Sequence, residues 1–123
     1  MEYKKKILLV DDKPVIAKML SMHLTEFDCI YFSNPLKCIK WLMVNERPAL
    51  IISDLKMPSY SGRKFLSYIK GSDQYKNIPF MILSSEEDPE DKAELFQKGC
   101  IDYIMKPFNP LDVRLRVLHV VNR

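Results

Sequence analysis

Carboxylates, hydroxyls and a lysine stand directly after short apolar runs in this 123-residue sequence. The residues concerned are Asp11, Asp12, Asp54, Ser84 and Lys106. If the apolar runs are buried parallel strands, these side chains lie outside the carboxyl ends of the strands, where open parallel sheets bind ligands. We therefore treat them as candidates for one shared site.

Three neighbouring aspartates would repel one another in a partly dry cleft, and a divalent cation would remove that repulsion. Ligand atoms that are all oxygen favour a hard ion, magnesium or calcium, over zinc. A lysine and a hydroxyl on the opposite side suit a phosphoryl group, to which lysine acts as a point charge. Since phosphoryl transfer depends mainly on positioning and charge neutralisation, these residue types together predict phosphoryl-transfer chemistry.

Each residue also has a plainer interpretation. Asp12 could cap a helix, Ser84 could lie in a turn, and Lys106 could be a solvated surface lysine. Their joint position at strand ends on one edge is what favours a ligand site.

The elements that must position these residues alternate between strand and helix. Continuous apolar runs predict strands buried on both faces, and apolar residues at helical spacing predict helices. The expected strands cover residues 7–10, 27–32, 50–52, 80–83 and 101–105. The apolar residues that indicate the helices lie within 15–24, 36–43, 65–69, 93–96 and 111–121. This alternation predicts an α/β fold, a doubly wound five-stranded parallel sheet with helices on both faces.

Capping signals agree with these helices. A capping side chain precedes a proline at Asn34-Pro35, Asp88-Pro89 and Asn109-Pro110. Lys13-Pro14 is a weaker version of the same signal, and Gly99 stands where the fourth helix should end.

Length and composition exclude several classes of protein. The chain is 47% hydrophobic and 28% charged, which is ordinary for a globular domain, and we expect a single domain over residues 1–123 without an effector domain. The apolar runs are too short for a membrane span or a signal peptide. The net charge of +3 is a weak excess and no helix concentrates lysine and arginine, so we expect neither a membrane nor a direct nucleic-acid partner. Cys29, Cys38 and Cys100 lack a Cys-x-x-Cys pair, which predicts reduced thiols in a cytoplasmic protein.

Four motifs resemble the receiver domain of two-component response regulators, and the resemblance covers essentially the whole chain. The motifs are Leu9-Val10-Asp11-Asp12, Asp54-Leu55-Lys56-Met57-Pro58 with Gly62, Ser84-Ser85, and residues 102–108 (Asp-Tyr-Ile-Met-Lys-Pro-Phe). The resemblance implies a flavodoxin-like sheet with the strand order 2-1-3-4-5.

The resemblance also implies a role for each acidic residue. Asp54 is expected to be the phosphoacceptor, a carboxylate nucleophile that forms an aspartyl phosphate. Asp11 and Asp12 are expected to hold Mg²⁺ (or Mn²⁺), Asp12 directly and Asp11 through water, together with Asp54 and the main-chain carbonyl of Lys56. We also expect Lys56 to pair with Glu86 across the cleft and to hinder the hydrolytic water.

The remaining roles concern the phosphoryl group and the response to it. Lys106 is expected to contact the phosphoryl group after a cis Lys106-Pro107 bond, and Ser84 to donate a hydrogen bond to it. Ser84 and Tyr103 are expected to form the switch, in which Tyr103 fills the space that Ser84 vacates. The changed surface would be the fourth helix, fifth strand and fifth helix.

The implied function is that of a phosphorylation-dependent receiver in a two-component phosphorelay. Its phosphodonor would be a sensor histidine kinase or a histidine phosphotransfer protein. The chain would be no enzyme towards other substrates, and would assist only its own phosphorylation and dephosphorylation. In the helix at 111–121, the apolar residues cover a wider part of the circumference than a helix buried on one side needs. This surplus is compatible with a homodimer, an adjoining effector domain or an ordinary buried terminal helix.

Two other interpretations stay open at the level of the sequence. An aspartate-nucleophile phosphatase would use Asp11 instead of Asp54, although it usually carries aspartates two positions apart after the first strand. An interaction module of the same fold would act independently of phosphorylation. No glycine-rich nucleotide-binding motif is present.

Overall fold

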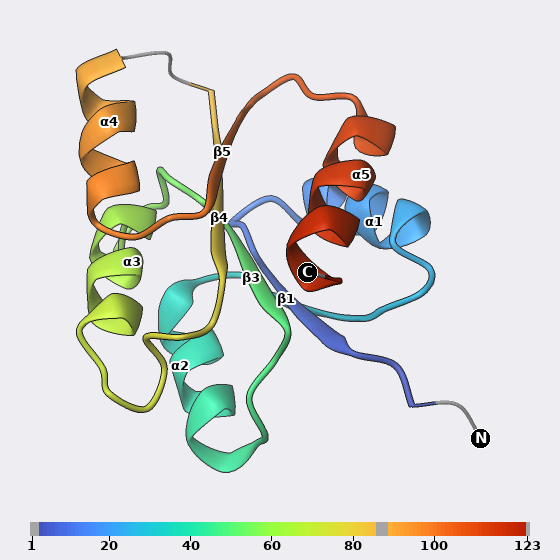
Figure 1. Ribbon diagram of the computed structural model, residues 1–123, viewed down its shortest axis with the longest axis horizontal. Helices are drawn as coiled ribbons and strands as arrows, with labels where there is room; N and C mark the ends of the chain where they lie inside the picture. Colours follow the sequence, from blue (N-terminus) through green and yellow to red (C-terminus); the bar gives the residue numbers. More distant parts are fainter. Residues whose placement is uncertain (1–2, 86–88, 123) are drawn as a thin grey trace.

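The computed structural model describes residues 3–85 and 89–122 of the chain. Strands and helices alternate throughout these residues (Figure 1). In chain order they are β1 (Lys6–Val10), α1 (Pro14–His23), β2 (Asp28–Phe32), α2 (Pro35–Val44), β3 (Leu50–Asp54), α3 (Gly62–Lys70), β4 (Phe80–Ser84), α4 (Pro89–Gln97), β5 (Asp102–Met105) and α5 (Pro110–Val121).

All strand pairs are parallel, and the order across the sheet is β2-β1-β3-β4-β5. Helices α1 and α5 cover one face of the sheet, and α2, α3 and α4 cover the other (Figure 1). The predicted doubly wound fold and its 2-1-3-4-5 order are therefore confirmed.

Alternating side chains of each strand supply two separate cores. In β1, Ile7 and Leu9 belong to the core under α1 and α5, whereas Leu8 and Val10 belong to the core under α2, α3 and α4. This follows from the period of two in a strand. The central strands β3 and β4 are buried along their whole length, as expected for strands covered on both faces.

Two strands begin one residue later than expected. The strand predicted at 27–32 begins at Asp28, because the Phe27 amide donates to the Leu24 carbonyl (3.0 Å) and Asp28 is the first residue aligned with Lys6 of β1. The strand predicted at 101–105 begins at Asp102. In both cases an apolar residue precedes the sheet and packs against its core, so hydrophobicity alone overestimates the strand.

Caps that the sequence predicted are in place. The Asn34 side chain accepts from the Lys37 amide at 3.0 Å, and the Asn109 side chain accepts from the Leu111 amide at 2.9 Å. Lys13 supplies no side-chain cap to α1, as the weaker signal indicated. Gly99 has a φ of +112°, the left-handed region that favours glycine. The predicted cap at Asp88 lies outside the described residues.

The cysteines pack as small hydrophobic residues. Cys38 and Cys100 are buried and Cys29 is partly buried, and all three are free thiols. Burial raises the pKa of both Cys29 and Cys100 to about 11, so these thiols are protonated at neutral pH. Among the helices described, none has both the length and the apolar character that crossing a membrane requires.

Candidate functional site

The candidate site lies at the carboxyl edge of the sheet. In the parallel register Val10 is aligned with Ser53, so Asp11 follows β1 beside Asp54, the last residue of β3. Asp54 is in turn aligned with Leu83, which places Ser84 next to it at the end of β4. The sheet thus brings together three strand ends that are far apart in the sequence.

The three predicted aspartates form one cluster. Asp11, Asp12 and Asp54 each offer a carboxylate oxygen, and these oxygens all lie within 4.8 Å of one another. Asp11 and Asp54 are buried, with 3% and 7% of their surface exposed, whereas Asp12 is exposed at the rim. A set of oxygen donors at this spacing, open on one side, fits a hard divalent ion that keeps some of its water.

Lys106 lies between two of these carboxylates. Its Nζ is 3.1 Å from Asp11 Oδ2 and 3.2 Å from Asp54 Oδ1. The backbone holds the lysine in this place, since its amide donates to the Ser84 carbonyl at 2.7 Å. The Lys106-Pro107 peptide bond is cis, as the resemblance implied. The interpretation of Lys106 as a solvated surface lysine is wrong.

Opposing influences act on the Asp54 carboxylate. Burial raises the pKa of Asp54 above its usual value, and the negative charge of Asp11 raises it further. The positive charge of Lys106 and the hydrogen bond from the Leu55 amide, 2.9 Å from Oδ1, act in the opposite direction without cancelling the rise. The Asp54 carboxylate is therefore costly to ionise in this pocket, and additional positive charge would stabilise it.

Gly62 holds the loop after β3 against the site. Its amide donates to the Leu55 carbonyl at 2.8 Å, where α3 begins. A Cβ on Gly62 would lie 2.1 Å from the Asp54 carbonyl oxygen, far inside van der Waals contact. The sequence placed Gly62 in a motif, and the structure gives the physical reason: only a residue without a side chain permits this close approach to the Asp54 backbone.

The other aspartate of the pair, Asp12, is no helix cap. The N-cap of α1 is Lys13, whose amide donates to Asp11 Oδ1 at 2.8 Å. The interpretation of Asp12 as a plain cap is therefore wrong, and its carboxylate stays at the open side of the cluster. Lys56, two residues beyond Asp54, is exposed, and its expected partner Glu86 lies outside the described residues.

Ser84 and Tyr103 lie on neighbouring strands. Ser84 is the buried last residue of β4, so the interpretation of it as a turn residue is wrong. Tyr103 is a buried residue of β5, and the Lys92 ammonium of α4 lies 5.5 Å from the centre of its ring. The structure thus holds Tyr103 inside the α4–β5 region.

One residue at the site was missed by the sequence reasoning. The Tyr31 hydroxyl donates to the main-chain carbonyl of Asp11 at 2.7 Å. Burial, followed by the charges of Asp11 and Asp12, raises the pKa of Tyr31, so the hydroxyl keeps its proton at neutral pH. Tyr31 belongs to β2, opposite Leu9 of β1, and only the strand order with this register would have pointed to it.

Comparison with known proteins gives the family of this chain. A family model described as the response regulator receiver domain matches residues 7–118. The chain is 32% identical over 119 residues to the transcriptional regulatory protein SrrA of Staphylococcus aureus (strain NCTC 8325 / PS 47), covering 95% of this chain and 48% of SrrA. It is 28% identical over 118 residues to the sensor histidine kinase TmoS of Ectopseudomonas mendocina, covering 95% of this chain and 12% of TmoS.

A solved structure is similar along nearly its full length. Chemotaxis protein CheY4 of Vibrio cholerae is 30% identical, with a TM-score of 0.85 over 97% of this chain and 99% of that chain. The two curated relatives are longer, and this chain spans about half of one and a much smaller part of the other. With its fold, its cluster of acidic residues and the family model in agreement, the chain belongs to the family of response regulator receiver domains.

Proposed function

We propose that this chain is a signalling receiver that accepts a phosphoryl group on Asp54 from a phosphohistidine of a partner protein, in the presence of Mg²⁺. One observation carries the proposal: the Asp54 carboxylate lies within 4.8 Å of those of Asp11 and Asp12 and 3.2 Å from the Lys106 ammonium. The proposed nucleophile, the Asp54 carboxylate, therefore has both the proposed ion site and a cation for the phosphoryl group beside it.

In the transfer, a carboxylate oxygen of Asp54 forms a bond to phosphorus. The phosphorus–nitrogen bond of the donor breaks, and its electron pair stays on the imidazole nitrogen. Within residues 3–85 and 89–122, the Asp54 carboxylate contacts the Leu55 amide and the Lys106 ammonium, in both cases through Oδ1. Oδ2 is therefore the oxygen left for bond formation or for the ion.

Several groups of the chain lower the barrier by their charge and position. Asp11, Asp12, Asp54 and the main-chain carbonyl of Lys56 would hold Mg²⁺, which supplies positive charge against the phosphoryl oxygens. Lys106 places a second positive charge beside Asp54, and Ser84 offers a hydroxyl from the next strand. Because the carboxylates of Asp11, Asp12 and Asp54 are already gathered before the donor arrives, the ion site needs little reorganisation at the moment of transfer.

The output would pass through Ser84 and Tyr103 to α4, β5 and α5. A new dianionic group beside Ser84 favours a conformation in which Ser84 and Lys106 turn towards it, and Tyr103 follows. We place the chain in the cytoplasm, where a sensor histidine kinase or a histidine phosphotransfer protein would be the donor. It would act on no further substrate. We also propose that it works as the receiver part of a longer protein, either a transcriptional regulator such as SrrA or a sensor kinase such as TmoS.

The test is phosphorylation with a small donor. The chain is incubated with acetyl phosphate and Mg²⁺, and the intact mass and the modified residue are determined. We expect one phosphoryl group on Asp54, none without Mg²⁺, and none in Asp54→Asn. Asp73→Asn, a fully exposed aspartate in the loop after α3, is the matched control and should be modified as the wild type is.

Other outcomes separate the alternatives. A phosphoryl group on Asp11 would favour the phosphatase-like interpretation. A folded chain that binds Mg²⁺ and takes up no phosphoryl group would contradict the proposal and favour an interaction module that acts independently of phosphorylation.

A further inference from the structure

The peptide between Asp11 and Asp12 is held on several sides. The Asp11 amide donates to the Phe32 carbonyl at 3.2 Å, and Asp11 Oδ1 accepts from the Lys13 amide at 2.8 Å. The Asp11 carbonyl accepts from the Tyr31 hydroxyl at 2.7 Å. This carbonyl lies beyond the end of β1 at Val10, and it is a side chain of the edge strand that provides its hydrogen bond.

Asp12 is held in a different way. Its carboxylate is exposed, and in the part of the chain that the structure describes it takes part in no hydrogen bond or ion pair. Its place in the acidic cluster therefore depends on its backbone. Because a peptide unit is planar, fixing the Asp11 carbonyl also fixes the orientation of the Asp12 amide and the position of the Asp12 Cα.

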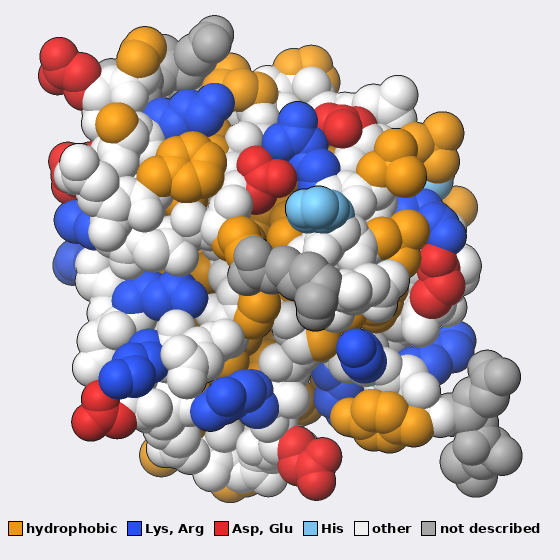
Figure 2. Space-filling view, viewed as in Figure 1, with side chains coloured by type: hydrophobic (Ala, Val, Ile, Leu, Met, Phe, Trp, Pro, Cys, Tyr) orange, Lys and Arg blue, Asp and Glu red, His pale blue; other side chains and the backbone are white. Residues whose placement is uncertain are grey.

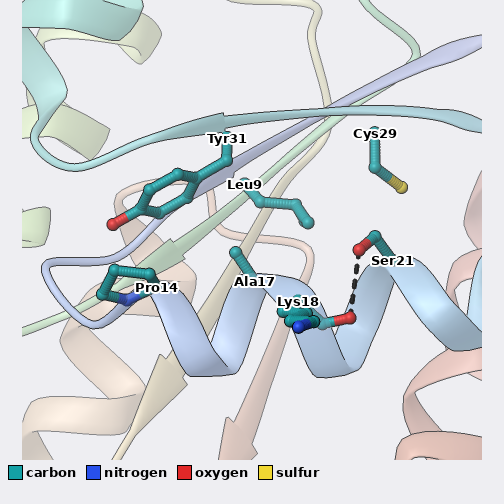
Figure 3. Close-up of a pocket in the computed structure, with 7 residues that line it drawn as sticks. All are labelled: Leu9, Pro14, Ala17, Lys18, Ser21, Cys29 and Tyr31. Atoms are coloured by element: carbon teal, nitrogen blue, oxygen red, sulfur yellow. Dashed lines mark hydrogen bonds between the residues drawn. The ribbon is translucent and has the colours of Figure 1, made fainter.

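The surroundings of Tyr31 show which part of the side chain acts at the site. The ring stands over α1 with its hydroxyl end near Pro14, and it borders a pocket of about 240 Å³ between α1 and β2 (Figure 3). Leu9, Ala17, Ser21 and Cys29 line the same pocket. Tyr31 is 36% exposed and fills no core position, so its short hydrogen bond to Asp11 is the specific interaction that it makes.

We propose that Tyr31 is a positioning residue of the metal and phosphorylation site, whose hydroxyl fixes the Asp11–Asp12 peptide and thereby keeps the Asp12 carboxylate in place for a divalent ion. The inference rests on the proposed function, in which Asp12 is a metal ligand. Groups that orient metal ligands without touching the metal commonly contribute to affinity in this way. A peptide held in place also loses less conformational freedom when the ion binds.

The test uses Tyr31→Phe, which keeps the ring beside Pro14 and removes only the hydroxyl. We expect the Kd for Mg²⁺, measured by calorimetric titration, to rise about three- to tenfold, the effect of one hydrogen bond. The acetyl phosphate reaction should slow by a similar factor at low Mg²⁺ and return to within about twofold of wild type at saturating Mg²⁺. Far-ultraviolet circular dichroism establishes that both proteins are folded at the temperature of the titration.

Tyr68→Phe is the matched control, because Tyr68 is a partly exposed tyrosine on α3 that packs against the Tyr75 ring away from the acidic cluster. It should leave the Kd for Mg²⁺ unchanged. An unchanged Kd in Tyr31→Phe would overturn the role of Tyr31, whatever its effect on stability. A wild-type chain that binds no Mg²⁺ would contradict the proposed function itself, so the two failures are distinguishable.

Discussion

Lys106 contacts the two buried carboxylates at the sheet edge. Lys106 approaches both Asp11 and Asp54 within 3.2 Å, and these two side chains are almost completely buried. Buried carboxylates that lose their partner destabilise a fold because the remaining charge has no compensation. In the unmodified protein, Lys106 therefore also stabilises the fold by compensating the charges of Asp11 and Asp54.

Replacing Lys106 with methionine should show how much this compensation contributes to stability. Lys106→Met keeps an unbranched side chain of nearly the same length and removes its charge, and we expect a loss of about 1.5–3 kcal/mol in the free energy of unfolding without Mg²⁺. Saturating Mg²⁺ should restore part of that loss by neutralising the same carboxylates. Urea denaturation with and without Mg²⁺ measures both effects, and Lys76→Met, at an exposed pair with Asp73, should change the stability little. Equal stabilities of wild type and Lys106→Met would contradict this account.

Asp54 should also make stability depend on pH. Because burial raises the pKa of Asp54 in the folded state, its ionisation is less favourable in the folded than in the unfolded chain. Its contribution to stability is fully present below the unfolded pKa and is lost as the pH rises through the folded pKa. Without Mg²⁺, Asp54→Asn should therefore melt at a higher temperature than wild type at neutral pH, and the difference should shrink in acid. A difference that is the same at both pH values would argue against a raised pKa.

At the scale of elements, the site depends on how closely α3 approaches the end of β3. The first residue of α3 is Gly62, and its position leaves no room for a Cβ beside the Asp54 carbonyl. The start of α3 therefore packs directly against the backbone at the end of β3. A change there should affect folding and the site together.

Gly62→Ala tests this contact. The added Cβ must displace either α3 or the Asp54 backbone, so we expect a destabilisation of about 1–3 kcal/mol or more and weaker Mg²⁺ binding in the variant that remains folded. Gly71→Ala is the control, because Gly71 has a φ of −83° and its Cβ would meet the Ser67 carbonyl oxygen at 3.0 Å, a milder contact. Thermal melts and Mg²⁺ titration of both variants decide the matter, and equal effects of the two substitutions would contradict the close-approach argument.

At the scale of the whole molecule, α5 presents more apolar surface than the core uses. Val113, Val117 and Val120 are buried, while Leu111 and Leu115 are 59% and 67% exposed. In Figure 2, hydrophobic side chains lie among charged ones on the face that carries α5. The surplus that the sequence indicated is thus present in the structure, and a homodimer or an adjoining domain stays a prediction.

Sedimentation of the phosphorylated and unphosphorylated chain tests the homodimer. If the exposed side of α5 forms the dimer, phosphorylation should raise the sedimentation coefficient, and Leu115→Asp should abolish that increase while leaving the melting temperature of the monomer nearly unchanged, since Leu115 is largely solvated. Lys64→Asp, an exposed position on α3, serves as the control for the change of charge. A monomer in both states at high concentration would exclude the homodimer.

The sequence by itself determined the alternation of strands and helices, the approximate place of each element and the set of chemical groups at the strand ends. These follow from local properties: apolar periodicity, side-chain caps such as Asn34 and Asn109, and the residue types that follow each strand. The strand order was predicted as well, from the resemblance of the motifs to those of a family. The prediction failed at Phe27 and Ile101, where an apolar residue packs against the core before the strand begins.

Only the tertiary structure decided how those groups meet. The contact of Lys106 with both Asp11 and Asp54, the absence of space at Gly62, and the hydrogen bond from Tyr31 to Asp11 each join residues from different elements. Such contacts depend on register and distance across the sheet, and local sequence patterns carry no information about either. For this reason the sequence could name the members of the site, whereas the fold alone determined which of them touch and which neighbours hold them in place.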